Sequence, residues 1–252
     1  MERRERTEEK VQELFHAPAA GDEGTDPEFM QILQNYIFGD VCYTGSLDNR
    51  MRELVTITVL AAVQALPQLK AHLGACLHVG CTPVELREAV YQCAPFLGFP
   101  RTLNAIAVLN EVLTERGITL PLPRQGTLTS EQERYEKDFA LQPPACGDAL
   151  RERCARLPGG FAQAVPRFLT ELSGDFATRS GLDGRTRELL TVVLLAALGG
   201  AAAQLKGHVR GALALGSTRE ELVCALVHAS SYMGSPRLFS ALDAAGELLE
   251  EP

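Results

Sequence analysis

The sequence predicts an all-α protein made of two tandem homologous helical domains, and three observations support this prediction. Residues 47–86 and 182–222 are closely similar, so the chain carries an internal duplication whose period is 187 − 52 = 135 residues between equivalent arginines. Helix caps and apolar faces with helical spacing recur in both copies, whereas strand-like alternation is nearly absent. The period matches the size of an ordinary domain, so we expect one domain per copy, at residues 1–122 and 127–252.

Composition and charge narrow the class of protein and of partner. With 46% hydrophobic residues, the 252-residue chain can bury a sizeable core. A formal net charge of −8 disfavours a nucleic-acid or anionic-membrane partner. The charged N-terminal residues contain no apolar signal segment, and the longest apolar run, residues 189–203, is short for a membrane span and interrupted by glycines. We therefore expect a cytoplasmic protein that binds neither nucleic acid nor membrane.

The cysteine pattern indicates free thiols. The chain has seven cysteines, an odd number, with no C-x-x-C pair and none at matching positions of the two copies. A disulfide framework or a zinc site requires regular spacing of its cysteines. We expect scattered thiols in a reducing compartment.

The first two long helices of the first copy are predicted from their caps. Asp26 followed by Pro27 starts a helix that continues to about residue 38. Asp48 caps the next helix, which spans about 49–63. This second helix is apolar on nearly all sides, so it should be buried.

Three further helices complete the first copy. Pro67 starts a helix that ends at about residue 79, before Gly80. Thr82 and Glu85 form a capping box that starts a helix to about residue 96. A glycine and a proline then break the chain, and the last helix runs to about residue 116.

The second copy repeats this plan after a linker at residues 121–126. Its predicted helices span 129–141, 148–156, 161–176, 183–198, 202–215, 218–232 and 236–250. A second capping box, Thr218 with Glu221, stands where the first copy has its own. One extra residue lies between Glu188 and His208 compared with the first copy.

The candidate functional residues are the few polar groups that recur inside this apolar core. Glu53 and Glu188 begin the most hydrophobic helix of each copy, where an acid also complements the helix dipole. His72 and His208 lie on the following helix among apolar neighbours, where a histidine is usually a satisfied core or interface residue. Recurrence in the same order in both copies favours a functional pair, although duplicated packing would also produce it.

Two arginines form a second candidate group. Arg101 and Arg237 each follow a Gly-x-Pro motif at a helix start. A cation there opposes the helix dipole, so each needs a partner, either a carboxylate, another subunit or an anionic ligand. One Glu and one His per copy are too few ligands for a metal site.

Longer motifs around these residues carry a resemblance to a known family. In the first copy they are Arg50-x-Arg52-Glu53-Leu54, Leu69-Lys70-x-His72-Leu73, Gly80-x-Thr82-x-x-Glu85-Leu86-Arg87-Glu88 and Gly98-Phe99-Pro100-x-x-Leu103-Asn104-Ala105. They resemble the carboxymuconolactone decarboxylase family, which includes alkylhydroperoxidase-like proteins, and the resemblance covers both copies. It implies an all-α fold of the alkylhydroperoxidase-like type. It also implies a homo-oligomer, which for a fused pair is a trimer of two-domain chains.

The redox branch of this family pairs a Glu and a His with a C-x-x-C motif between them. Glu53 and His72 keep the spacing of that branch, 72 − 53 = 19 residues, but Ala65 and Gln68 stand at the thiol positions. A peroxide-reducing centre of this kind needs a thiolate. A peroxiredoxin-like activity thus remains a disfavoured alternative that would need other thiols, such as Cys76 and Cys81.

The decarboxylase branch is the better resemblance, and it implies a cofactor-independent reaction on a small anionic lactone or enolisable acid. His72 or His208 would then act as acid or oxyanion donor, and Glu53 or Glu188 would orient the histidine. By the same resemblance, Arg101 and Arg237 would bind the anionic substrate. The chain departs from the branch in having no Trp and in carrying His228 where the first copy has Gln92. A non-catalytic helical oligomer or ligand-binding protein is the remaining alternative.

Helix geometry adds one expectation about the first pair. In a tight antiparallel hairpin, Glu53 lies well before the turn and His72 shortly after it, which separates them by roughly 10 Å in height at 1.5 Å per residue. We therefore expect no direct hydrogen bond between Glu53 and His72 within one hairpin.

Overall fold

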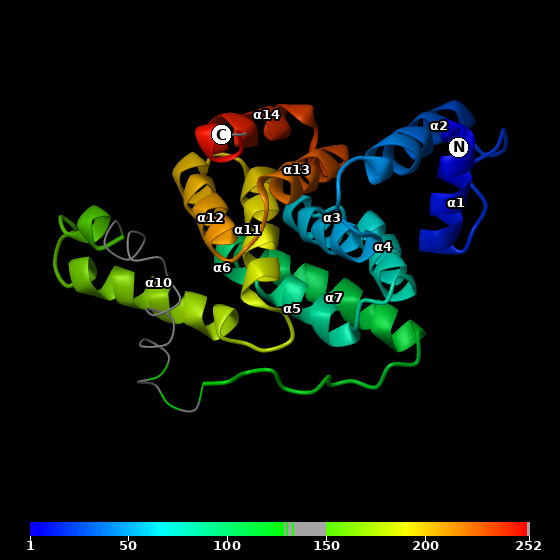
Figure 1. The fold of residues 1–252 in the computed structure, drawn as a ribbon. Coiled ribbons are helices and arrows are strands. Elements are labelled where there is room, and N and C mark those ends of the chain that lie inside the picture. Colours follow the sequence, from blue (N-terminus) through cyan, green and yellow to red (C-terminus); the bar gives the residue numbers. More distant parts are fainter. Residues whose placement is uncertain (129, 131–132, 134–149, 251–252) are drawn as a thin grey trace.

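The computed structural model describes residues 1–128, 130, 133 and 150–250 (Figure 1). Within these residues all regular secondary structure is helical, which confirms the predicted fold class. The expected helix at 129–141 lies outside the described residues, and of the expected helix at 148–156 residues 150–154 are helical. No helix in the described part of the chain is long and apolar enough to cross a membrane.

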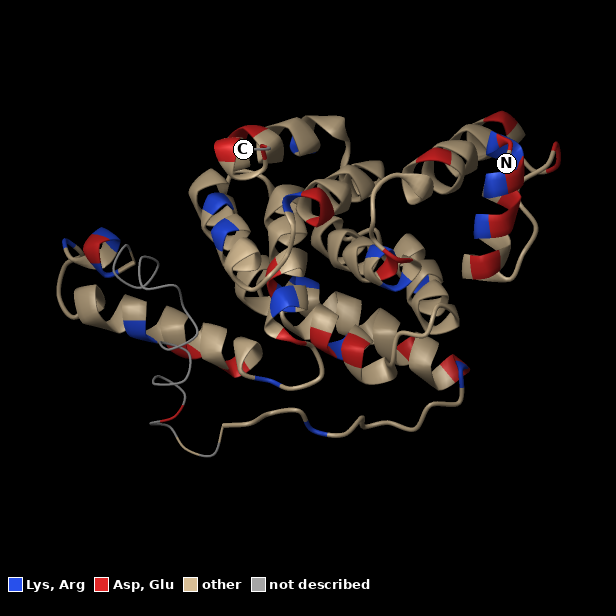
Figure 2. Cartoon of the chain, viewed as in Figure 1, with Lys and Arg blue, Asp and Glu red and all other residues tan. Residues whose placement is uncertain are grey.

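The first repeat follows the predicted plan with two differences. Its elements are α1 (Arg3–Phe15), α2 (Pro27–Gln34), the π-helix η1 (Asn35–Asp40), the 3₁₀ turn η2 (Val41–Tyr43), α3 (Asn49–Val63), α4 (Leu66–His78), α5 (Pro83–Tyr91), α6 (Ala94–Leu97) and α7 (Phe99–Glu115). The helix expected to reach residue 96 is broken between α5 and α6, because Pro95 has no N–H to continue the ladder. Helix α1 was not predicted, since acidic and basic residues follow one another along it and its apolar stripe is short (Figure 2).

The second repeat has the same order of helices. Its elements are α10 (Phe161–Ala177), α11 (Gly184–Leu198), α12 (Ala202–Ala214), α13 (Arg219–Met233), α14 (Ser235–Ala245) and the 3₁₀ turn η3 (Gly246–Leu248). The predicted caps are present: Asp48 accepts from the Met51 amide, and Thr218 forms its capping box with Glu221. Helix α13 is continuous where the first repeat breaks into α5 and α6, because Ser231 stands at the position of Pro95.

The two repeats share one hydrophobic core. Helices α3 and α11 are buried along nearly their whole length, and α3 packs against both α11 and α13 of the second repeat (Figure 1). Side chains of both repeats, such as Leu54 and Leu190, belong to the same apolar cluster. The residues that face each pair of candidate side chains therefore come from both repeats.

A smaller apolar cluster joins α1 and η1 to the outer side of α4. It contains Val11, Leu14, Phe38 and Ala75, with Phe15 packed against it. This cluster places the end of α1 over the middle of α4, where His72 lies. The second repeat has no such cover among its described residues, and α10 instead extends along the edge of the molecule (Figure 1).

Candidate functional site

The first candidate pair forms a direct hydrogen bond. Glu53 lies in the first turns of α3 and His72 in the middle of α4, and His72 Nδ1 is 2.8 Å from Glu53 Oε2. The pair is enclosed, with Glu53 1% and His72 7% exposed. An ionised carboxylate can only accept, so Nδ1 carries the hydrogen and donates it. The other ring nitrogen, Nε2, is left to act on a substrate.

The second pair repeats this geometry in a more open setting. His208 Nδ1 donates to Glu188 Oε2 over 2.8 Å. The side chains of His208 and Glu188 are 31% and 26% exposed, against 9% and 2% for His72 and Glu53. The chain therefore holds two Glu–His pairs with the same tautomer and very different access to solvent.

These hydrogen bonds show that our expectation of a wide gap between Glu53 and His72 was wrong. The gap assumed helices with antiparallel axes, whereas helices in globular proteins most often cross at about 50°. A 2.8 Å contact between the side chains requires such an inclined crossing of α3 and α4. The extra residue of the second repeat falls in the loop between α11 and α12, so it leaves the pairing of His208 unchanged.

Each pair is completed by an aromatic residue of the other repeat. Tyr232, on α13, lies edge-on to His72 with ring centroids 5.3 Å apart. Phe96, on α6, lies edge-on to His208 at 5.8 Å. Phe15 adds a second aromatic contact to His72, also at 5.3 Å, and accounts for the closure of the first pair. The candidate sites thus lie between the repeats.

A second buried histidine adjoins the first pair. His228 is 1% exposed, and its Nε2 lies 2.9 Å from Thr56 Oγ1. Burial, then the charges of Arg52 and His72, lowers the pKa of His228 to about 3, so the ring is neutral at physiological pH. The Thr56 hydroxyl already donates its one hydrogen to the Arg52 carbonyl, so His228 Nε2 must be the donor to Thr56.

The buried arginines next to the glutamates are held differently in the two repeats. Arg52 donates to the carbonyl oxygens of Val41, Thr44 and Leu47. Arg187, its counterpart, donates to the Arg179 carbonyl and reaches Glu88 Oε2 at 3.4 Å. Glu88 is replaced in the second repeat by Cys224, which donates to the Thr44 carbonyl. The buried cation next to the first pair therefore bonds to carbonyl oxygens, and the one next to the second pair bonds to a carboxylate.

The structure does not bring the two predicted substrate-binding arginines to these pairs. Arg237 donates to the Ala197 carbonyl, and Ala197 lies 197 − 188 = 9 residues after Glu188 on α11. This separation is about 13 Å along a helix. Arg101 is exposed at the start of α7, where its carbonyl accepts from the Gln64 side chain at the end of α3. Arg237 instead caps the C-terminal end of α11, where a cation is favoured by the helix dipole.

The thiols named for a peroxidase alternative are enclosed. Cys76 is fully buried and Cys81 is 4% exposed. Burial raises the pKa of Cys76 well above its usual range, so the reactive thiolate is disfavoured. In the described residues, no cysteine has the exposed, electropositive surroundings of a redox thiol.

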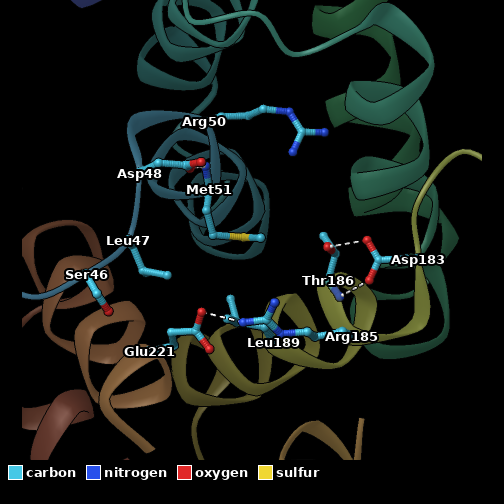
Figure 3. A pocket seen from close by; sticks show the side chains of 10 residues that line it. All are labelled: Ser46, Leu47, Asp48, Arg50, Met51, Asp183, Arg185, Thr186, Leu189 and Glu221. Carbon is cyan, nitrogen blue, oxygen red and sulfur yellow. Dashed lines mark hydrogen bonds and ion pairs between the residues drawn. The ribbon is translucent and has the colours of Figure 1, made fainter. Parts of the chain in front are cut away.

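A hollow of about 220 Å³ lies apart from both pairs, between the N-terminal ends of α3 and α11 (Figure 3). Its charged side chains are already occupied. Arg185 pairs with Glu221, and Asp48 and Asp183 accept hydrogen bonds as helix caps. None of the four candidate Glu and His side chains lines it, so we do not place the reaction there.

Two residues next to the first pair were missed by sequence reasoning. Tyr232 and His228 are distant in sequence from Glu53 and His72, and only the packing of α13 on α3 brings them together. The difference between His228 and Gln92 at equivalent positions was the one signal available in the sequence.

Known proteins with similar sequences include two decarboxylases. A 4-carboxymuconolactone decarboxylase from Acinetobacter baylyi is 33% identical over 91 residues, which are 36% of this chain and 68% of that protein. A nitrosuccinic acid decarboxylase from Metarhizium robertsii is 26% identical over 85 residues, which are 34% of this chain and 59% of that protein. An uncharacterised 15.0 kDa protein of Paracoccus denitrificans is 37% identical over 109 residues, 42% of this chain and 81% of that protein.

The fold and the repeats agree with these similarities. The solved structure of a "putative gamma-carboxymuconolactone decarboxylase subunit" from Burkholderia xenovorans LB400 superposes with a TM-score of 0.54 at 23% identity, covering 96% of this chain and 98% of that one. This likeness supports the fold alone. The sequence model of the carboxymuconolactone decarboxylase family matches twice, at residues 27–111 and 163–247, once in each repeat. The chain therefore belongs to the carboxymuconolactone decarboxylase family, as a member with two tandem copies of the family's domain.

Proposed function

We propose that this protein catalyses a cofactor-independent decarboxylation or proton transfer on a small carboxylated lactone or enolisable acid. One observation carries the proposal: in both repeats a carboxylate holds a histidine through Nδ1 at 2.8 Å. This arrangement fixes the tautomer and leaves Nε2 as a single acid–base atom. The names of two relatives, both decarboxylases, support the reaction class.

The chemistry needs one proton and one site for developing charge. Loss of carbon dioxide breaks the bond to the carboxylate carbon and leaves its electron pair in a conjugated enolate. The imidazolium form of His72 or His208 then delivers its Nε2 proton to carbon, and solvent protonates the ring again. Glu53 or Glu188 stabilises the imidazolium and keeps the ring oriented.

Electrostatics favours the first pair for an anionic substrate. Arg52, 2% exposed, bonds to backbone carbonyl oxygens and has no ion-pair partner among the described residues. Its positive charge is felt at His228, whose pKa it lowers after burial does. The equivalent charge of Arg187 is offset by Glu88. An anion beside His72 would therefore experience a more positive potential than one beside His208.

Removal of each histidine tests the proposal. Turnover of 4-carboxymuconolactone would be followed by loss of its ultraviolet absorbance and by release of carbon dioxide. We expect the variant with both His72→Ala and His208→Ala to lose at least about 100-fold in kcat, the usual contribution of a general acid. Lys70→Ala is the matched control, because Lys70 lies on the same helix as His72 but forms ion pairs with Glu111 and Glu115 at the surface.

The single variants show which pair works. Loss with His72→Ala alone assigns the reaction to the first repeat, and loss with His208→Ala alone assigns it to the second. If the double variant keeps the wild-type kcat and circular dichroism shows both proteins folded, the Glu–His pairs are structural and the proposal is refuted.

We also propose that the chain assembles as a homotrimer. Large apolar side chains are exposed at equivalent positions of the two repeats, Leu103 on α7 and Phe239 on α14, each 62% exposed. Phe161 and Phe168 of α10 are 60% and 61% exposed, so a further apolar surface lies at the edge of the molecule. Such surfaces are typical of protein interfaces. Light scattering would give three times 27.3 kDa for the trimer, and a monomeric mass would refute it.

A further inference from the structure

The first Glu–His pair is bordered by two polar side chains of the second repeat whose hydrogen-bonding capacity is not used. Tyr232 and His228 both project from α13 toward α3 and α4, as their contacts to His72 and Thr56 show. Neither the Tyr232 hydroxyl nor His228 Nδ1 has a hydrogen-bond partner, although both atoms are buried. Buried polar atoms without partners are costly, so two of them next to one reactive pair indicate a place for a ligand.

The unused atom of His228 is an acceptor. Because Nε2 donates to Thr56, Nδ1 of this neutral ring carries a lone pair. His72 has the opposite tautomer, with hydrogen on Nδ1 and the reactive lone pair or proton at Nε2. The two histidines therefore offer different groups to the space between them and Tyr232.

The unused group of Tyr232 is a donor. Burial, then the negative charge of Glu53, raises the pKa of Tyr232 well above its usual range, so its phenol keeps its hydrogen. The hydroxyl lies beside Thr56 and Glu53 without hydrogen-bond geometry to either. The ring is 5.3 Å from His72 and 5.7 Å from His228, measured between centroids.

The second pair lacks both groups although its backbone is equivalent. Phe96 stands at the position of Tyr232, and Gln92 at the position of His228, each offset by 136 residues (232 − 96 and 228 − 92). Phe96 has no hydroxyl to donate, and Gln92 Oε1 already accepts from Arg187 at 3.5 Å. The duplication thus supplies a natural comparison for the two side chains.

We propose that Tyr232 and His228 are part of the first active site, which takes a substrate whose carbonyl oxygen is conjugated to the departing carboxylate. Tyr232 donates to that oxygen as negative charge develops on it, and His228 Nδ1 accepts from a hydroxyl group of the substrate or from water. Tyr232 is then a catalytic residue and His228 a binding residue. The proposal rests on the proposed function and adds that the first repeat carries the chemistry because it alone receives this donor.

Replacement by the residues of the second repeat tests the proposal with substitutions that the fold already tolerates. With 4-carboxymuconolactone as substrate, we expect Tyr232→Phe to lower kcat about 100-fold, as loss of one oxyanion donor does. KM should change by less than about threefold, because the donor acts mainly in the transition state. We expect His228→Gln to lower kcat/KM roughly threefold to tenfold, the effect of one neutral hydrogen bond.

Tyr91→Phe is the matched control, since Tyr91 lies against Arg87 and Arg179 and away from both pairs. Its kcat should equal that of the wild type. If Tyr232→Phe also leaves kcat and KM unchanged in an active enzyme, the proposal is overturned while the proposed function stands.

A measurement that needs no turnover separates the two conclusions. Nitrogen-15 spectra of the histidine side chains should show His228 neutral, with hydrogen on Nε2, from pH 8 down to 4.5. Addition of 4-carboxymuconolactone should shift the His228 Nδ1 resonance in the wild type and shift it less in Tyr232→Phe. A protein that binds in this way without turnover would refute the proposed function alone. A protonated His228 at pH 6, or a Nδ1 resonance that the lactone leaves unchanged, would refute the further inference.

Discussion

Removal of the Glu88 carboxylate should strongly destabilise the protein, because this residue joins the two repeats. Glu88, on α5, is 0% exposed and accepts two hydrogen bonds from Arg179, at 2.8 and 3.0 Å. Arg87 and Arg187 contact the same carboxylate at 3.2 and 3.4 Å. The hydrogen bond to Glu88 is the main cause that raises the pKa of Arg179, whereas burial lowers that of Arg187.

The size of the effect follows from burial. In Glu88→Gln the arginines keep their charges, but the side chain loses its own. The side chains of Arg87 and Arg187 are 10% and 8% exposed, so water cannot replace the carboxylate. Breaking a buried pair in this way costs about 3–5 kcal/mol of unfolding free energy. For a chain of this size the melting temperature should fall by on the order of 10 °C.

Thermal and urea unfolding followed by circular dichroism at 222 nm would measure this loss. The control is Glu8→Gln, which removes the exposed i,i+4 pair between Arg4 and Glu8 and should cost less than about 1 kcal/mol. If Glu88→Gln and Glu8→Gln unfold at the same temperature, the carboxylate does not hold the repeats together and the reasoning is wrong.

Three further predictions test the packing and protonation described above. Gly181→Ala should cost about 1–3 kcal/mol more than Gly80→Ala in urea unfolding, because both glycines have positive φ but only the Gly181 Cβ would press on Val84, at 2.8 Å; equal costs would contradict this. His228→Gln should flatten the pH dependence of stability: the unfolded ring binds a proton below about pH 6.5 and the folded ring does not until about 3, so wild-type stability falls by roughly 1 kcal/mol per pH unit as pH drops through this window, and parallel curves for the two proteins would exclude a neutral His228. Diethyl pyrocarbonate should modify His208 faster than His72, whose side chain is 9% against 31% exposed, and Phe15→Ala should accelerate His72; peptide mapping in which His72 reacts first would refute the enclosure of the first pair.

The sequence alone predicted the helices well where their signals are local. Asp48, Thr82 and Thr218 accept the capping hydrogen bonds that their positions predict, because a helix N-terminus leaves amide groups that only a nearby side chain can satisfy. The duplication and the family were likewise visible in the order of recurring residues. Helix α1 was missed because its stability comes from a few apolar contacts to η1 and α4, which its charged composition does not reveal.

The candidate site was predicted in part. Recurrence selected Glu53, His72, Glu188 and His208, and the structure brings each glutamate to its histidine. The same reasoning selected Arg101 and Arg237, which the structure places away from these pairs. Residues that recur for helix capping and residues that recur for chemistry give the same signal in a sequence.

The sequence by itself thus determined the fold class, the repeat and the identity of the paired side chains, since each depends on local spacing or on comparison of the two copies. Only the tertiary structure decided which residues of one repeat face the pair of the other. Tyr232 reaches His72, and Phe96 reaches His208, through the packing of helices that are far apart in the chain. The inclination of α3 to α4, the cover that Phe15 provides and the tautomer of His228 all depend on such contacts, which no spacing within one segment records.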